Sequence, residues 1–172
     1  MVIMNFTLPS DIFISKTGFV KFTSDTPLES IEAENNQVGS VLNVSQKTVV
    51  FKVPVASFKG FNSDLQHEHL NENYMETDNY PQATFKGKII EDVDLSKPGT
   101  YKVRAKGILS IHGEEKERII PETITVNAGK ITIKSNFEIP LVDHNISIPK
   151  IVGQKIAEVI SIELSTELKP QA

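Results

Sequence analysis

Alternation of apolar and polar side chains with a period of two residues is the feature that most restricts the fold of this chain. It is clearest in four segments, residues 48–55, 100–112, 130–139 and 160–165. Between Thr100 and His112, one face carries Tyr101, Val103, Ala105, Gly107, Leu109 and Ile111. Successive side chains of a strand point to opposite faces of the sheet, so each segment is predicted to be a strand with one buried face.

Weaker alternation predicts further strands between these segments. The candidates are residues 18–24, 30–34, 40–45, 83–90 and 119–126, separated by turn-forming pairs and triplets such as Thr26-Pro27, Asn35-Asn36, Lys97-Pro98-Gly99 and Asn127-Ala128-Gly129. About eight strands joined by short turns indicate an all-β fold, a single antiparallel up-and-down β-barrel. A two-sheet sandwich is the competing architecture. Residues 1–172 contain no repeat or linker and are interpreted as one domain.

Residues 63–74 interrupt the alternation. Leu65, His69 or Leu70, and Tyr74 have the spacing of one helical face, and Ser63 or Asp64 could cap the start of the helix. We therefore expect one short helix that lies across the barrel or closes one of its ends.

The composition excludes several classes of function. The chain has no cysteine, which removes thiol nucleophiles, thiolate zinc sites and disulfides. Its formal net charge is -4 and its Lys and Arg residues are not clustered, which disfavours nucleic acid and anionic membrane surfaces as partners. No stretch approaches the roughly 20 apolar residues of a membrane span.

The inward faces of the predicted strands carry both large apolar and small side chains. A barrel of about eight strands is just wide enough to be filled by side chains or to hold one small ligand. In one interpretation the inward residues line an apolar tunnel; the predicted ligand-binding residues are then Phe51, Val53, Phe85, Gly87, Val103, Ala105, Gly107, Leu109, Ile133, Ser135, Phe137, Ile160 and Ile162. In the other, the glycines mark bulges or tight bends of a solid barrel.

Four histidines are the candidates for metal chemistry: His67, His69, His112 and His144. On a helix, His67 and His69 would point to nearly opposite sides and could not share one ion, and no spacing predicts a third ligand. The chain has no nucleophile elbow, phosphate loop or dinucleotide fingerprint. We therefore expect a binding protein without a cofactor or metal, not an enzyme. The alternatives are a His-based metal-binding protein or hydrolase-like enzyme, and a structural or stress-response partner protein with a solid barrel.

Three stretches, taken with Gly18–Phe22, resemble the YceI-like family. They are residues 69–87, which contain Tyr80-Pro81; residues 107–113, which end in His112-Gly113; and residues 137–149, which run from Phe137 to Ile148-Pro149. Two places differ from the family pattern. Residues 66–68 read Gln-His-Glu where an arginine-aspartate pair is common, and residue 144 is His where tyrosine is common.

The resemblance implies a lipocalin-like barrel that encloses a polyisoprenoid, a quinone or a similar long-chain lipid. It favours a protein that stores or transports this lipid. The protein is then expected to be periplasmic or secreted, with an export leader that is absent from this sequence. A cytoplasmic protein is the alternative. From the residues alone, a homodimer through the outer surface is also expected, because Val50 and Ile108 place apolar groups on otherwise polar faces.

Overall fold

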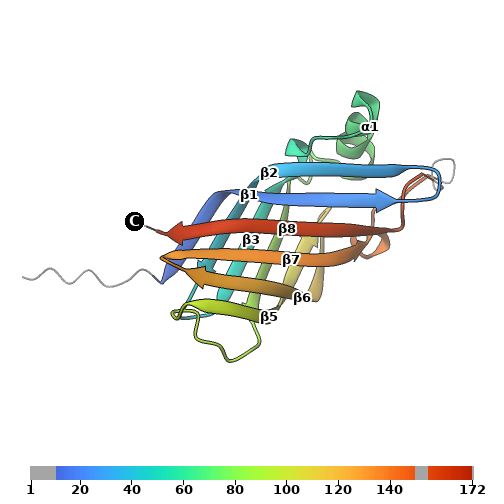
Figure 1. Ribbon diagram of the computed structural model, residues 1–172. Helices are drawn as coiled ribbons and strands as arrows, with labels where there is room; N and C mark the ends of the chain where they lie inside the picture. The colour runs from blue at the N-terminus through green and yellow to red at the C-terminus, as the bar shows by residue number, and fades with distance from the viewer. Residues whose placement is uncertain (1–10, 150–154, 172) are drawn as a thin grey trace, which may run out of the picture.

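The computed structural model describes residues 11–149 and 155–171, and the strands in this part of the chain form one closed antiparallel barrel (Figure 1). They are β1 (Ile12–Asp25), β2 (Ser30–Asn43), β3 (Thr48–Pro54), β4 (Gln82–Ile89), β5 (Gly99–Ile111), β6 (Glu114–Asn127), β7 (Lys130–Pro140) and β8 (Val159–Pro170). Each strand pairs with the next, and β8 pairs with β1. The predicted up-and-down barrel is confirmed, and the closed single sheet rules out the two-sheet sandwich.

Helical turns cluster at one end of the barrel. The helix α1 (Asp64–His69) continues as the π-helical turn η2 (Leu70–Tyr74), and two short 3-10 turns are η1 (Val55–Ser57) and η3 (Leu141–His144). Ser63 caps α1, because its Oγ accepts a hydrogen bond of 3.1 Å from the Gln66 backbone N–H. The predicted short helix is therefore confirmed. Within the described residues, no helix has the length and apolar character needed to cross a bilayer.

Two hairpins show why local sequence produces this meander. The β5–β6 loop is His112-Gly113 and the β6–β7 loop contains Ala128-Gly129, and all four residues have positive φ angles. Two-residue loops with positive φ at both positions match the right-handed twist of paired strands, and glycine adopts this conformation without strain. These loops fold β5, β6 and β7 back on one another in sequence order.

The second strand differs from its prediction. Residues 30–34 and 40–45 were expected to be two strands around a turn at Asn35-Asn36, but β2 runs through this site without a break. The Asn35 side chain makes the polar contacts that a turn would otherwise supply: its Nδ2 donates to Pro54 O at 2.8 Å and its Oδ1 accepts from Gln37 N at 2.9 Å. A register shift between Gly18 and Val20 on β1 absorbs the irregularity.

The interior has a densely packed half and a half with a cavity. The packed half lies toward the start of β1 and the end of β8, and its side chains are almost fully shielded from solvent: Val38, Leu42, Val49, Ile89, Leu95, Val103, Ala105, Ile124, Ile131, Ile133 and Leu168. The other half lies at the end that carries α1 and η3. The barrel is thus neither hollow throughout nor completely filled.

Candidate functional site

An apolar cavity of about 200 Å³ occupies the α1 end of the barrel. All eight strands contribute inward side chains to its wall, and four of these are the phenylalanines Phe22, Phe51, Phe85 and Phe137. The atoms that face the space are almost all carbon. A space of this kind excludes ions and favours the hydrocarbon part of a ligand.

Side chains outside the strands cover the cavity. Gln66 of α1, Leu70 and Tyr74 of η2, and Met75 directly after it lie in its wall, together with Leu141 of η3. Burial raises the pKa of the Tyr74 hydroxyl. We use the name helical cover for residues 63–75, whose helix α1 lies above β2 near one end of the barrel in Figure 1.

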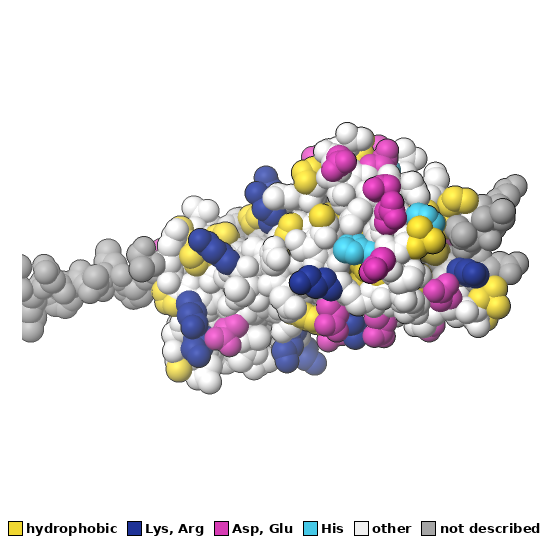
Figure 2. Space-filling model, turned by 90° about the horizontal axis from the view of Figure 1, so that it is seen from above, with side chains coloured by type: hydrophobic (Ala, Val, Ile, Leu, Met, Phe, Trp, Pro, Cys, Tyr) yellow, Lys and Arg dark blue, Asp and Glu magenta, His cyan; other side chains and the backbone are white. Residues whose placement is uncertain are grey.

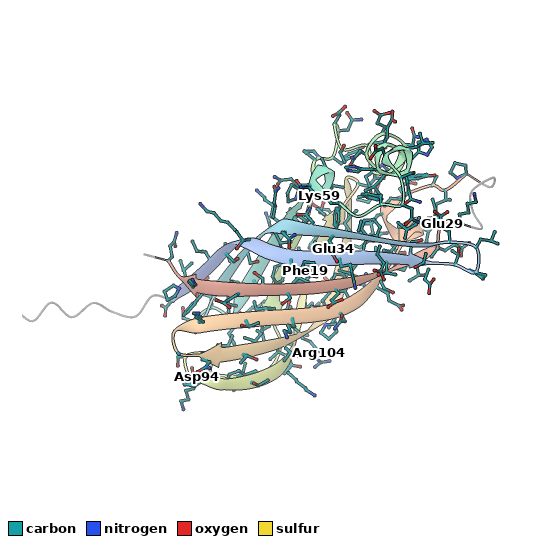
Figure 3. The ribbon with its side chains drawn as sticks, turned by 45° about the horizontal axis from the view of Figure 1, so that its top comes forward. Phe19, Glu29, Glu34, Lys59, Asp94 and Arg104 are labelled. Carbon is teal, nitrogen blue, oxygen red and sulfur yellow. The ribbon has the colours of Figure 1, made fainter. Side chains whose placement is uncertain are left out.

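The helical cover is tied to the barrel through the turn between β1 and β2. Glu29 Oε1 accepts hydrogen bonds of 3.0 Å from Asn62 Nδ2 and from Gln66 Nε2. These two bonds, first that of Asn62, lower the pKa of the Glu29 carboxyl. Nearby, the backbones of Glu34 and Lys59 exchange hydrogen bonds of 2.7 and 2.8 Å (Figure 3).

The sequence-predicted residues divide between the two halves of the barrel. Eight of them lie in the cavity wall: Phe51, Val53, Phe85, Leu109, Ser135, Phe137, Ile160 and Ile162. Val103, Ala105 and Ile133 also point inward, but they are buried in the packed half and do not reach the cavity. Alternation identifies the inward face of a strand without giving the depth at which the interior opens.

Gly87 and Gly107 are not in the cavity wall either, and they pair with each other across β4 and β5. A Cβ atom on Gly107 would lie 2.0 Å from Lys86 O and 2.4 Å from Gly87 Cα. Gly107 therefore allows a close approach of two backbones and does not leave free volume, which corresponds to the bend interpretation of these glycines.

One wall residue that the sequence reasoning missed is a carboxylic acid. Glu122 lies between Ile120 and Ile124 on the inward face of β6, is 3% exposed and lines the cavity. Neither of its carboxyl oxygens has a hydrogen-bond partner among the described residues. Burial raises the pKa of Glu122 to about 8. The period of two in residues 119–126 places Glu122 on the face of Ile120 and Ile124, which is the signal that could have found it.

The four histidines do not converge. The His67 ring stacks on Phe61 with ring centroids 4.8 Å apart. Nε2 of His112 lies 2.5 Å from Glu76 Oε2, and its Nδ1 donates to His144 O at 3.1 Å. His144 is buried, with Nδ1 donating to Glu114 O at 3.1 Å. Within the described ranges, no three His, Asp or Glu side chains are arranged to hold a metal ion.

Comparison with known proteins gives one family and several structural relatives. A model of the YceI-like domain matches residues 14–168, and no curated protein sequence matches significantly. A polyisoprenoid binding domain from Saccharophagus degradans, implicated in plant cell wall breakdown, superposes with a TM-score of 0.79 at 13% identity, covering 94% of this chain and 99% of that domain. BcnA from Burkholderia cenocepacia has a TM-score of 0.69 at 19% identity, covering 87% and 95% of the two chains.

A third relative is the YceI protein of Campylobacter jejuni, with a TM-score of 0.63 at 15% identity and coverage of 100% and 92%. At these identities the structural likeness establishes a shared fold. The match of the domain model, by contrast, spans nearly the whole chain and establishes the family.

Proposed function

This chain belongs to the YceI-like family, and from that premise we propose that it binds a long apolar amphiphile, of the polyisoprenoid or quinone kind, inside its barrel. The observation that carries the proposal is the apolar cavity enclosed by eight strands and the helical cover. The polyisoprenoid binding domain from Saccharophagus degradans, which shares the fold, supports the choice of ligand class.

The physical basis of binding is burial of the chain of the ligand. Each methylene group removed from water contributes about 0.8 kcal/mol. Phenylalanine, isoleucine and leucine side chains from several strands contact the space, so a branched chain can meet apolar surface on every side. Affinity is then expected to rise with chain length until the ligand no longer fits the cavity.

We further propose that the protein stores or carries this lipid rather than transforming it. The wall of the cavity consists mainly of aliphatic and aromatic side chains, and the histidines do not form a reactive cluster within the described residues. Export to the periplasm or outside the cell, which the family resemblance favours, would place such a carrier between lipid surfaces.

Mass spectrometry of an organic-solvent extract of the purified protein tests the proposal directly. We expect a near-stoichiometric isoprenoid lipid that is absent from an extract of protein denatured and washed before extraction. Ser135→Phe, which adds a ring at the cavity wall, should lower this occupancy severalfold. The matched control is Ser161→Phe on β8, where the side chain is exposed. Equal lipid content in both variants, or no lipid in wild type and no uptake of added isoprenoid, would contradict the proposal.

A further inference from the structure

Glu122 lies at the inner end of the cavity, far from the helical cover along the barrel. Next to it, β6 and β7 pair through Thr123 and Lys134, so the adjacent inward residue on β7 is Ser135. Ser135 pairs with Leu164 on β8, and Leu164 pairs with Val20 on β1. All four inward residues line the cavity.

The packed half of the barrel begins immediately beyond this row. Ile124 and Ile133 pair across β6 and β7, and both are completely buried without contact with the cavity. Glu122 therefore marks the floor of the cavity, whereas Tyr74 and Met75 mark its covered end.

The carboxyl group of Glu122 lacks the partners that a buried acid normally has. Ser135, its nearest polar neighbour by register, donates its hydroxyl proton to Pro121 O at 2.6 Å, so this proton is not available to Glu122. Both oxygens of Glu122 are shielded from solvent and free of hydrogen bonds within the described part of the chain. Leaving a buried polar group unpaired is costly, so a group of this kind at a cavity wall points to a ligand that supplies the missing partner.

We propose that Glu122 binds an oxygen atom at the polar end of the lipid, so that the ligand lies with its polar end at the floor of the barrel and its chain toward the helical cover. This inference rests on the proposed lipid-binding function and adds the orientation and the head-group class. It differs from the simpler expectation that the head group of an amphiphile stays at the open, wetter end.

The chemistry of the acid selects the class of head group. With its pKa raised to about 8, Glu122 is mainly protonated at neutral pH, and its O–H can donate to a carbonyl or hydroxyl oxygen. Among the described residues no Lys or Arg lines the cavity, so a phosphate or carboxylate head at its floor would be buried without a counter-ion in the wall. The expected ligands are neutral isoprenoid alcohols, ketones or quinones.

The segment that covers the cavity carries several acidic side chains. Residues 60–85 contain Asp64, Glu68, Glu72, Glu76 and Asp78 but no Lys or Arg. Acidic side chains gather over this region in Figure 2. An anion next to these acidic side chains would meet repulsion, whereas a hydrocarbon chain under the apolar side chains of the cover would not.

A pair of matched probes tests the head-group contact. Farnesol and farnesane share one carbon skeleton, and only farnesol carries a hydroxyl group. Their affinities are measured by displacement of Nile red from wild type, Glu122→Leu, Glu122→Gln and Glu115→Leu. The ratio of farnesol to farnesane affinity should fall about fivefold in Glu122→Leu, the effect of one lost hydrogen bond. It should change less than twofold in Glu122→Gln, whose amide still donates, and in Glu115→Leu, which removes an exposed acid of β6.

Nuclear magnetic resonance provides the test of orientation. Farnesol labelled with ¹³C at the carbon that bears the hydroxyl should show nuclear Overhauser contacts to the methyl groups of Val20 and Leu164 at the floor. Contacts to Met75 or Leu70 instead would overturn the proposal, as would an unchanged affinity ratio in Glu122→Leu. Binding of neither probe to wild type would instead refute the lipid-binding function itself. Urea unfolding of each variant verifies that it is folded.

Discussion

At the scale of single residues, Glu122 makes the stability of the protein depend on pH. Its carboxyl has a pKa of about 8 in the folded barrel and 4.5 when unperturbed, so between these values the folded state holds a proton that the unfolded state has lost. Stability therefore falls as pH rises through this window, by up to about 5 kcal/mol for such a shift.

Glu122→Gln removes the contribution of this carboxyl to the pH dependence of stability and preserves the shape of the side chain. We expect the variant and wild type to have similar free energies of unfolding at pH 5, and the variant to be more stable by about 3 kcal/mol or more at pH 8.5. Urea titrations at both pH values measure the difference in free energy of unfolding between the variant and wild type. The contributions of other titrating groups are the same in both proteins and cancel in this difference. A difference that is the same at both pH values would show that Glu122 does not titrate between them.

Gly107 is the second residue whose identity the fold requires. Gly107→Ala would place a Cβ atom 2.0 Å from Lys86 O, so β4 and β5 would have to separate. Overpacking of this kind costs about 3 kcal/mol or more when a backbone must move. Gly39→Ala on β2 is the matched control, because its Cβ atom would have no neighbour nearer than 3.8 Å. Thermal unfolding of both variants checks this; equal melting temperatures would contradict it.

The sequence correctly predicted which side chains point into the barrel, but it did not predict which of them reach the cavity. The alternation correctly placed Phe51, Leu109 and Phe137 inward because side-chain direction in a strand is a local property. It could not separate them from Val103, since the distance of a residue from the cavity depends on strand tilt and on side chains from other strands. Glu122 was missed because a charged residue is normally exposed, and only the closed barrel shows it buried.

At the scale of elements, the helical cover is the least buried part of the cavity wall and is therefore the part best suited to open. None of the residues of α1 or η2 is fully buried. Segments with few buried apolar contacts open at low free-energy cost. The lipid is then expected to enter and leave at this end.

Glu29→Ala tests this view, because the substitution removes the acceptor of both Asn62 and Gln66. We expect faster amide hydrogen exchange in residues 64–74 and faster release of bound Nile red, with little change in the exchange of β5 and β6. Glu167→Ala, on the exposed face of β8, is the control. Unchanged exchange in the helical cover would mean that Glu29 does not hold it in place.

The ends of strands and helices could be predicted from the sequence where residues typical of turns or helix caps mark them. The hairpin at Ala128-Gly129 and the cap at Ser63 were both recognisable, because each depends on two or three neighbouring residues. The continuity of β2 through Asn35 was not, because the contact that permits it comes from Pro54, 19 residues away. Long-range hydrogen bonds of this type have no local signature.

At the scale of the whole molecule, the outer surface of the barrel carries the apolar residues from which a homodimer was expected. The homodimer stays a prediction. Val50 and Ile108 both face outward and each pairs with Lys86, from opposite sides. Ile108 is 39% exposed. If this surface joins two copies, Ile108→Lys should shift the mass measured by light scattering from dimer to monomer while leaving the cavity able to bind Nile red. A monomeric wild type would remove the expectation.

Because a single sheet closes on itself around the cavity, a ligand inside contacts every strand at once. Filling the cavity should therefore stabilise the barrel as one unit rather than one part of it. For a ligand that binds only the folded state, the gain is about 2.7 kcal/mol at a concentration 100 times the dissociation constant. For a chain of this size, we expect farnesol at that concentration to raise the melting temperature by roughly 6 to 10 °C. The increase should be small in Ser135→Phe and full in Ser161→Phe; equal increases in both would place the ligand outside the cavity.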